Sequence, residues 1–164
     1  MFNIFKKKTE SKEETKEVVY HAFGTGKIIP LDDVPDQVFA QRMMGDGFAI
    51  DLTDNKIVSP VDGEVILVFP TGHAFGLKTP DGVEILLHLG IDTVELNGEG
   101  FDGKVKQGDK VKVGDVLTIM DLDKIRAAGK SVVSPFILTS GQKVELKKAH
   151  QDVTPEDTDL FEFK

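Results

Sequence analysis

Short apolar runs separated by turn-forming residues recur along most of this chain, and each run has the length of a β-strand. Sixteen glycines and seven prolines stand between the runs, for example in Pro-Val-Asp-Gly at 60–63 and Thr-Pro-Asp-Gly at 79–82. These residue types supply the backbone angles that tight turns need. The spacing predicts an all-β protein, a compact antiparallel β-sandwich or barrel. The predicted strands cover residues 18–23, 47–52, 63–69, 82–89, 116–120 and 132–138.

Only two segments have a helical pattern, so we expect one or two short helices. The first covers residues 34–44, begins near Pro35 and ends at Gly45. The second covers residues 122–128 and ends at Gly129, a residue type common at helix C-termini.

The first 17 residues differ in composition from the rest of the chain. Residues 6–17 are almost entirely Lys, Glu, Thr and Ser, which predicts a flexible polar leader over 1–17 and one domain over 18–164. Phe2, Ile4 and Phe5 precede three lysines, a pattern that suits either a weak membrane-surface anchor or a frayed terminus. The second interpretation is favoured because one short turn buries little area.

Charge and residue usage exclude several classes of protein. The formal net charge of -8 disfavours binding to nucleic acid and favours a basic protein partner. No apolar run approaches the roughly 20 residues of a membrane span, and no signal peptide is recognisable. The chain has no cysteine, which suits a reducing compartment. We expect a cytoplasmic protein that meets a membrane only indirectly.

Without cysteine, the candidate reactive groups are four histidines and several carboxylates. His21 and His150 have undistinguished surroundings and are interpreted as surface or filler residues. His88 lies late in an apolar strand, where a histidine is usually a satisfied core residue. However, the carbonyl of Gly90 could accept a hydrogen bond from its Nδ1–H, which would leave Nε2 as a free nucleophile or ligand.

His73 stands at the start of the preceding strand. Hairpin pairing around 80–82 does not by itself bring His73 level with His88, so the sequence leaves open whether the two rings meet. Facing imidazoles could bind a metal, act as an acid/base pair or transfer a phosphoryl group. The chain has neither a His-Glu-x-x-His nor a His-x-His pair. It also lacks the Walker-type motif Gly-x-x-x-x-Gly-Lys-Ser/Thr, the glycine-rich loop that binds nucleotide phosphates. Phosphoryl chemistry here would therefore take its phosphate from another protein.

Several segments together resemble the glucose-type IIA component of the bacterial phosphoenolpyruvate:sugar phosphotransferase system. The main motif is Gly82-x-x-Ile85-Leu86-x-His88-Leu89-Gly90-Ile91-x-Thr93-Val94. Further segments in the family's order lie at 33–40, 43–47, 60–63, 71–75 and 97–101. The resemblance covers roughly residues 20 to 163, and its fold, a compact antiparallel sandwich or barrel, agrees with the pattern of strands.

The resemblance implies a phosphocarrier, a phosphotransferase component that acts stoichiometrically. The histidine-containing carrier HPr would phosphorylate Nε2 of His88, and a cysteine of a IIB domain would receive the group for sugar uptake. His73 would match the second active-site histidine, which stabilises the phosphoryl group, and Thr71 would match the residue that orients it. Gly72 stands where relatives commonly have Asn or Lys. No cofactor and no metal are implied; His73 and His88 would bind one only adventitiously.

The resemblance also implies a surface for protein partners. Asp36 and Asp92 would be acidic contacts for HPr. An apolar ring would surround the site and help to exclude water; it comprises Val38, Phe39, Met43, Met44, Phe69 and Leu86.

Two other functions remain open at this point. The first is a regulatory interaction module in which phosphorylation of His88 acts as a signal to other protein targets. The second is a metal-dependent hydrolase of similar β architecture, which the missing His-x-His pair disfavours.

Overall fold

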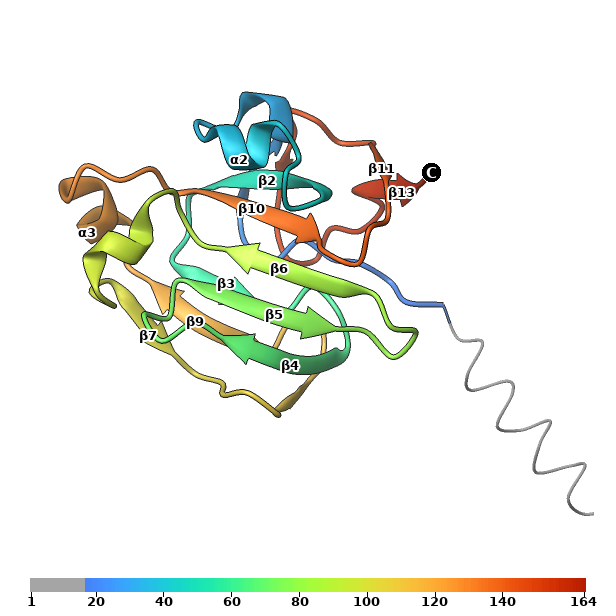
Figure 1. The fold of residues 1–164 in the computed structure, drawn as a ribbon, viewed down its shortest axis with the longest axis horizontal. Helices are drawn as coiled ribbons and strands as arrows, with labels where there is room; N and C mark the ends of the chain where they lie inside the picture. Colours follow the sequence, from blue (N-terminus) through green and yellow to red (C-terminus); the bar gives the residue numbers. More distant parts are fainter. Residues whose placement is uncertain (1–16) are drawn as a thin grey trace, which may run out of the picture.

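The computed structural model describes residues 17–164, in which antiparallel strand pairs dominate (Figure 1). The largest sheet has eight strands in the order β12-β1-β2-β10-β6-β5-β4-β8. Figure 1 shows β4, β5 and β6 lying side by side, followed by β10. The strands of this sheet are β1 (Gly26–Pro30), β2 (Asp46–Leu52), β4 (Gly63–Val68), β5 (Ala74–Lys78), β6 (Glu84–His88), β8 (Lys110–Val111), β10 (Val133–Leu138) and β12 (Asp152–Val153).

Two smaller sheets complete the fold. One has three strands, β3 (Lys56–Val58), β9 (Val116–Met120) and β7 (Phe101–Gly103), and the other pairs β11 (Val144–Leu146) with β13 (Phe161–Phe163). The helical elements are short: α2 (Gln37–Ala40), α3 (Leu122–Ala127) and the 3-10 turns η1 (Leu31–Asp33) and η2 (Thr93–Leu96). The predicted all-β antiparallel architecture with one or two short helices is therefore confirmed.

The central strands are buried on both faces, which explains their continuous apolar sequence. Successive side chains of a strand point to opposite faces. In β6, Ile85 and Leu87 belong to the main hydrophobic core, whereas Leu86 belongs to a smaller cluster on the opposite face. The smaller cluster also contains Ala74, from the start of β5, and Phe39, from α2. Helix α2 thus covers the outer face of the sheet beside the end of β6.

Five of the six predicted strands are present within about two residues of their expected limits. The strand predicted over 18–23 is wrong. Ala22 and Phe23 are fully buried, but the amides of His21 and Ala22 donate to the carbonyls of Pro60 and Asp157 rather than to a ladder. The apolar composition of this segment therefore reflects its burial in the core and does not indicate a strand.

The helix predicted over 34–44 is shortened to the single turn of α2. The carboxylate of Asp36 caps that turn by accepting from the Val38 amide at 2.8 Å. Arg42 then adopts a left-handed conformation with φ of 58°, which ends the helix. Residues 41–45 form a loop into β2 instead. The second predicted helix is confirmed as α3, followed by Gly129 with φ of 81°.

A buried carboxylate fixes the loop between α2 and β2. Asp46 accepts hydrogen bonds from Arg42 Nε at 3.0 Å, from the Gly47 amide at 2.9 Å and from the Val144 amide at 2.9 Å. Burial alone would raise the pKa of Asp46, but these donors outweigh it and the pKa is lowered. One ionised side chain thus joins the loop, β2 and β11.

The predicted leader lies outside the described residues except for Glu17. Among residues 17–164, no helix is long and apolar enough to cross a membrane.

Candidate functional site

The two histidines singled out from the sequence lie together at one end of the eight-stranded sheet. His88 is the last residue of β6, and His73 directly precedes β5. In the β5–β6 ladder the residue opposite His88 is Ala74, so the two histidines are offset by one position, as expected. Their ring centroids are nevertheless 5.1 Å apart, with planes inclined by 76°.

A tight turn before β5 accompanies this approach. The Gly72 amide donates to the Phe69 carbonyl at 2.7 Å, and the Phe69 amide donates to the Ala74 carbonyl at 3.0 Å. Gly72 has φ of 70°, a left-handed value that glycine adopts at little cost. His73 therefore belongs to a turn rather than to the regular strand, and its ring is not bound by the alternation of the ladder. Its carbonyl still accepts from the Leu89 amide at 2.7 Å.

His88 is held by the backbone, in the way expected from the sequence. Its Nδ1 lies 2.8 Å from the carbonyl oxygen of Gly90. Gly90 has φ of 78°, and a Cβ placed there would lie 2.5 Å from Cγ2 of Thr93. The position therefore requires glycine on both conformational and steric grounds.

His73 is held by a side chain instead. Its Nδ1 is hydrogen-bonded to Oγ1 of Thr71 at 2.5 Å. His73 is only 3% exposed, whereas His88 is half-buried. Because both Nδ1 atoms have partners, Nε2 is the nitrogen of each ring left for chemistry.

Burial makes both rings neutral at physiological pH. Burial, together with a smaller contribution from the neighbouring His88, lowers the pKa of His73 to about 4. Burial also lowers the pKa of His88, against the opposing effects of the Gly90 carbonyl and of the carboxylates of Asp36 and Asp92. A neutral His88 has an unprotonated nitrogen that can act as a nucleophile.

A phenylalanine ring lies beside each of the two histidines. The Phe39 ring lies 5.0 Å from the His88 ring, and the Phe69 ring lies 5.3 Å from the His73 ring. Phe39 and Leu86 are buried in the smaller cluster and expose little area to a partner. Phe69 is half-buried. The exposed members of the predicted ring are Val38, Met43 and Met44, with exposures of 40%, 69% and 42%.

The two predicted acidic contacts both act on His88 through their charge. Asp36 caps α2, and Asp92 precedes η2 with φ of 60°. Val94 is 52% exposed on η2, two residues after Asp92, and was not among the residues predicted to form the surface. Its place in the main motif was the one signal that pointed to it.

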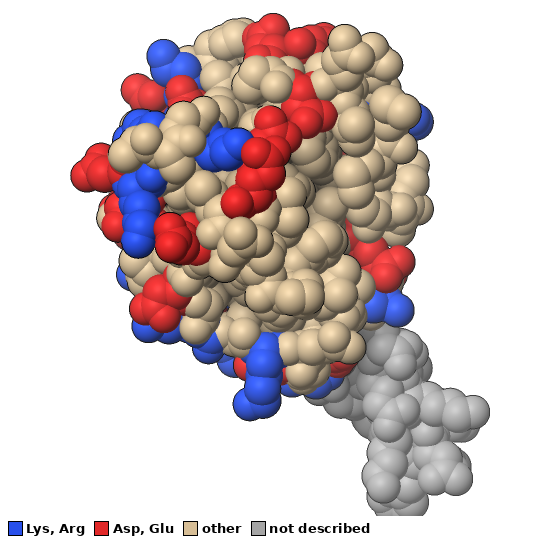
Figure 2. Space-filling model, turned by 60° about the vertical axis from the view of Figure 1, so that its left-hand side comes forward, with Lys and Arg blue, Asp and Glu red and all other residues tan. Residues whose placement is uncertain are grey.

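Figure 2 brings forward the left-hand side of Figure 1, toward which β6 runs. Uncharged side chains form a broad area over much of this face. A run of acidic side chains crosses its upper part, and charges of both signs lie to the left. The face therefore combines an uncharged centre with a charged border, as many docking surfaces do.

The other histidines lie apart from this pair. His21 Nδ1 is hydrogen-bonded to the Pro155 carbonyl at 3.1 Å. The side chain of His150 is 63% exposed and lies 4.0 Å from Asp33. In residues 17–164, no group of three or more His, Cys, Asp or Glu side chains is arranged to hold a metal ion.

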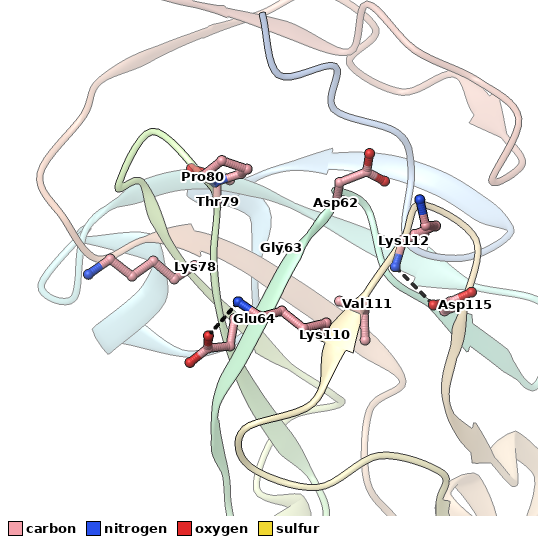
Figure 3. Close-up of a pocket in the computed structure, with 10 residues that line it drawn as sticks. All are labelled: Asp62, Gly63, Glu64, Lys78, Thr79, Pro80, Lys110, Val111, Lys112 and Asp115. Carbon is pink, nitrogen blue, oxygen red and sulfur yellow. Dashed lines mark hydrogen bonds and ion pairs between the residues drawn. The ribbon is translucent and has the colours of Figure 1, made fainter. Parts of the chain in front are cut away.

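A cavity of about 680 Å³ lies at the opposite end of β5 (Figure 3). Its lining carries both signs of charge: Lys110 pairs with Glu64 at 3.1 Å, and the Lys112 amide donates to Asp115. Lys78, at the end of β5, also lines it, whereas His73 directly precedes the same strand. The cavity and the two histidines therefore lie at opposite ends of β5.

Comparison with known proteins places these features in a family. Residues 18–144 match the family model described as phosphoenolpyruvate-dependent sugar phosphotransferase system, EIIA 1. The glucose-specific EIIA component of Halalkalibacterium halodurans is 43% identical over all of this chain and 96% of its own length. The corresponding component of Staphylococcus epidermidis is 46% identical over 83% of this chain and 82% of its own.

Two further relatives differ in kind. The glucose-specific EIICBA component of Staphylococcus saprophyticus is 48% identical over 90% of this chain, which matches 23% of that longer protein. The solved structure of glucose permease IIA from Mycoplasma capricolum is 41% identical, covers 89% of this chain and 96% of its own, and superimposes with a TM-score of 0.82. The chain belongs to the EIIA 1 family of the phosphoenolpyruvate-dependent sugar phosphotransferase system.

Proposed function

We propose that this protein is a phosphocarrier that receives a phosphoryl group on Nε2 of His88 and donates it to a cysteine of a IIB domain. The observation that carries the proposal is the pair of neutral, closely spaced imidazoles whose Nδ1 atoms are both engaged. The donor is phosphorylated HPr, and the names of the relatives favour a glucose-type permease as the acceptor. The protein would work in the cytoplasm beside that permease.

Acceptance is an in-line displacement at phosphorus. The lone pair of His88 Nε2 attacks, the bond between phosphorus and the donor's histidine nitrogen breaks, and its electron pair returns to that nitrogen. The attacking ring gains positive charge as the new bond forms. The Gly90 carbonyl, 2.8 Å from Nδ1, stabilises that charge by accepting a strengthened hydrogen bond.

Donation reverses the roles. The thiolate of the IIB cysteine attacks phosphorus, the bond to His88 Nε2 breaks, and its electron pair returns to the ring. The transfer needs positioning and charge stabilisation more than covalent machinery. Two oriented imidazoles in an apolar setting supply both.

His73 would stabilise the group in transit. If the Thr71 hydroxyl donates to Nδ1, the proton of the neutral ring is on Nε2, which can then donate to a phosphoryl oxygen. The low pKa of His73 suits this role because the ring stays neutral beside His88. Burial of His73 also keeps the donor in place before the phosphoryl group arrives.

The exposed apolar side chains around His88 would form the docking surface. Val38, Met43 and Met44 give an adaptable contact area for two different partners. Asp36 and Asp92 lie close enough to His88 to affect its pKa, so they would attract a basic partner to the site. The net charge of -8 acts in the same direction.

Incubation with phosphoenolpyruvate, enzyme I and HPr tests the proposal. We expect the intact mass to rise by one phosphoryl group that is acid-labile and maps to His88. His88→Ala should remain unlabelled, whereas His150→Ala, at an exposed histidine away from the pair, should be labelled like the wild type. Labelling of His88→Ala would refute the assignment.

A further inference from the structure

We infer that Ser134 is a positioning residue for His88, acting through the backbone of Gly90. The inference rests on the proposed role of His88 as phosphoryl acceptor. Ser134 lies on β10 and is fully buried. Its hydroxyl accepts a hydrogen bond from the Gly90 amide at 2.9 Å and donates one to the Val132 carbonyl at 3.0 Å.

The hydroxyl bonds to the backbone in the gap between the end of the β10–β6 ladder and the isolated bridge of Ile91 with Ser131. The ladder between β10 and β6 runs from Leu138↔Ile85 to Phe136↔Leu87. Beyond that pair, the Ser134 side chain takes the Gly90 amide. Without it, that buried amide would lose its partner, an arrangement that native structures avoid.

A second bond from the same segment holds the other side of Gly90. The Ile91 amide donates to the Ser131 carbonyl at 3.1 Å. Because the peptide between Gly90 and Ile91 is planar and trans, its N–H and C=O point in opposite directions. Fixing the Ile91 amide therefore also aims the Gly90 carbonyl, the acceptor for His88 Nδ1.

Glycine makes this support necessary. Gly90 has φ of 78° and, lacking Cβ, has the widest backbone freedom of any residue. The bonds to Ser131 and Ser134 hold the two peptides that flank it. Loosening them would move the carbonyl away from Nδ1, which lies 2.8 Å from it.

The consequence for chemistry is a change of tautomer. With Nδ1 protonated and bonded to the Gly90 carbonyl, Nε2 has the lone pair that attacks phosphorus. If the carbonyl moves, the tautomer with its proton on Nε2 becomes populated, and that form cannot attack. Ser134 thus favours the reactive form of His88 from a distance of two hydrogen bonds.

The chain contains its own matched control. The tripeptide Val-Ser-Pro occurs at 58–60 and at 133–135, and Ser59 is as fully buried as Ser134. The Ser59 hydroxyl donates to the Val61 carbonyl at 2.7 Å and accepts from the Val61 amide at 3.4 Å. Both bonds of the Ser59 hydroxyl go to a residue of the same turn. Removing this hydroxyl therefore measures the general effect of losing a buried hydroxyl, without an effect on Gly90.

The test compares Ser134→Ala with Ser59→Ala in the full chain. Imidazole ¹⁵N NMR of the unphosphorylated proteins reports the tautomer, and single-turnover labelling by phosphorylated HPr reports the rate. For Ser134→Ala we expect a measurable population of the Nε2-protonated form of His88 and acceptance slowed about tenfold, comparable to the loss when a residue that orients a metal-bound histidine is replaced. Ser59→Ala should keep the wild-type tautomer and rate.

An unchanged His88 tautomer in Ser134→Ala, or a rate no slower than that of Ser59→Ala, would overturn the inference. If Ser134→Ala does not fold, the pair Ser134→Cys and Ser59→Cys replaces it, because sulfur keeps the volume but is a weak acceptor. The same two outcomes then decide. A wild-type protein that HPr does not label would overturn the phosphocarrier proposal instead, and the tautomer measurement would still be decisive for Ser134.

Discussion

His73 and His88 carry the same ring within 5.1 Å of each other, but the fold holds them by different means. The Nδ1 of His88 is bonded to a backbone carbonyl, which substitution can move but not delete, whereas that of His73 is bonded to a hydroxyl that substitution can remove. His88 is half-buried, and two carboxylates act to raise its pKa, whereas His73 is almost wholly buried. The difference suits an accessible nucleophile beside an enclosed hydrogen-bond donor.

The largest effect on this division of roles is expected from His73→Gln. Acceptance of the phosphoryl group by His88 should persist, because the nucleophile is intact. Donation to a IIB domain should fall about 100- to 1000-fold, the usual loss for one donor that stabilises developing charge. Separate rapid-quench measurements of the two half-reactions check this. Equal losses in both steps would show that the two histidines do not divide the roles.

Acid should reveal the difference in burial. The unfolded chain binds a proton at His73 near the ordinary pKa of 6.5, whereas the folded chain does so only at about 4. The unfolded state therefore binds more protons between these values, so the stability that this group contributes is complete above pH 6.5 and declines as pH falls toward 4. As pH falls across this window, the free energy of unfolding measured with urea should decrease more for the wild type than for His73→Gln. Parallel pH profiles would contradict the buried, neutral state of His73.

A smaller effect should follow from displacing the backbone acceptor of His88. In Gly90→Ala the new Cβ would lie 2.5 Å from Cγ2 of Thr93 and 2.8 Å from the Ser131 carbonyl. We expect a loss of about 1–3 kcal/mol in the free energy of unfolding together with slower acceptance. Gly82→Ala is the control, because Gly82 also has positive φ, 92°, but nothing lies within 4 Å of its Cβ position. Similar losses in both variants would remove the steric argument for Gly90.

The smallest effect is expected from Thr71→Val, which removes the hydroxyl that holds His73. Donation should slow by about tenfold, equivalent to roughly 1.4 kcal/mol and typical of one lost buried hydrogen bond. Acceptance by His88 should be unchanged. Thr79→Val, at the other end of β5, is a control that alters a buried hydroxyl away from the histidines. A donation rate equal to that of this control would show that Thr71 does not orient His73.

The sequence predicted the strands better than the approach of the histidines. Strands such as β9 and β10 are mostly apolar and are bounded by turn residues, so the local pattern is enough to predict them. The segment 18–23 has a similar composition but is buried without pairing, since apolarity alone does not select a hydrogen-bond partner. The helix predicted over 34–44 was too long for another reason. The backbone turns at Arg42, whose Nε donates to Asp46 at the start of β2.

The features of the site also differ in whether local sequence can predict them. The bond from His88 Nδ1 to Gly90 joins residues two positions apart, so it could be predicted locally. The contact with His73 depends on the turn at 69–72, in which Gly72 has positive φ, and on the register of β5 and β6. The burial of Phe39 and Leu86 depends on how α2 covers the sheet, which no local pattern reports.

Asp46 links the C-terminal strands to the loop that carries Met43 and Met44, which belong to the proposed docking surface. Its carboxylate is bonded both to Arg42, beside Met43 and Met44, and to the amide of Val144. Val144 lies in β11, which pairs with β13 through Val144↔Phe163. We therefore expect a truncation or fusion at β13 to act on the loop of residues 41–45 through a single carboxylate. The C-terminal strands would thus support the proposed docking surface, although none of the residues assigned to the proposed phosphoryl transfer lies on them.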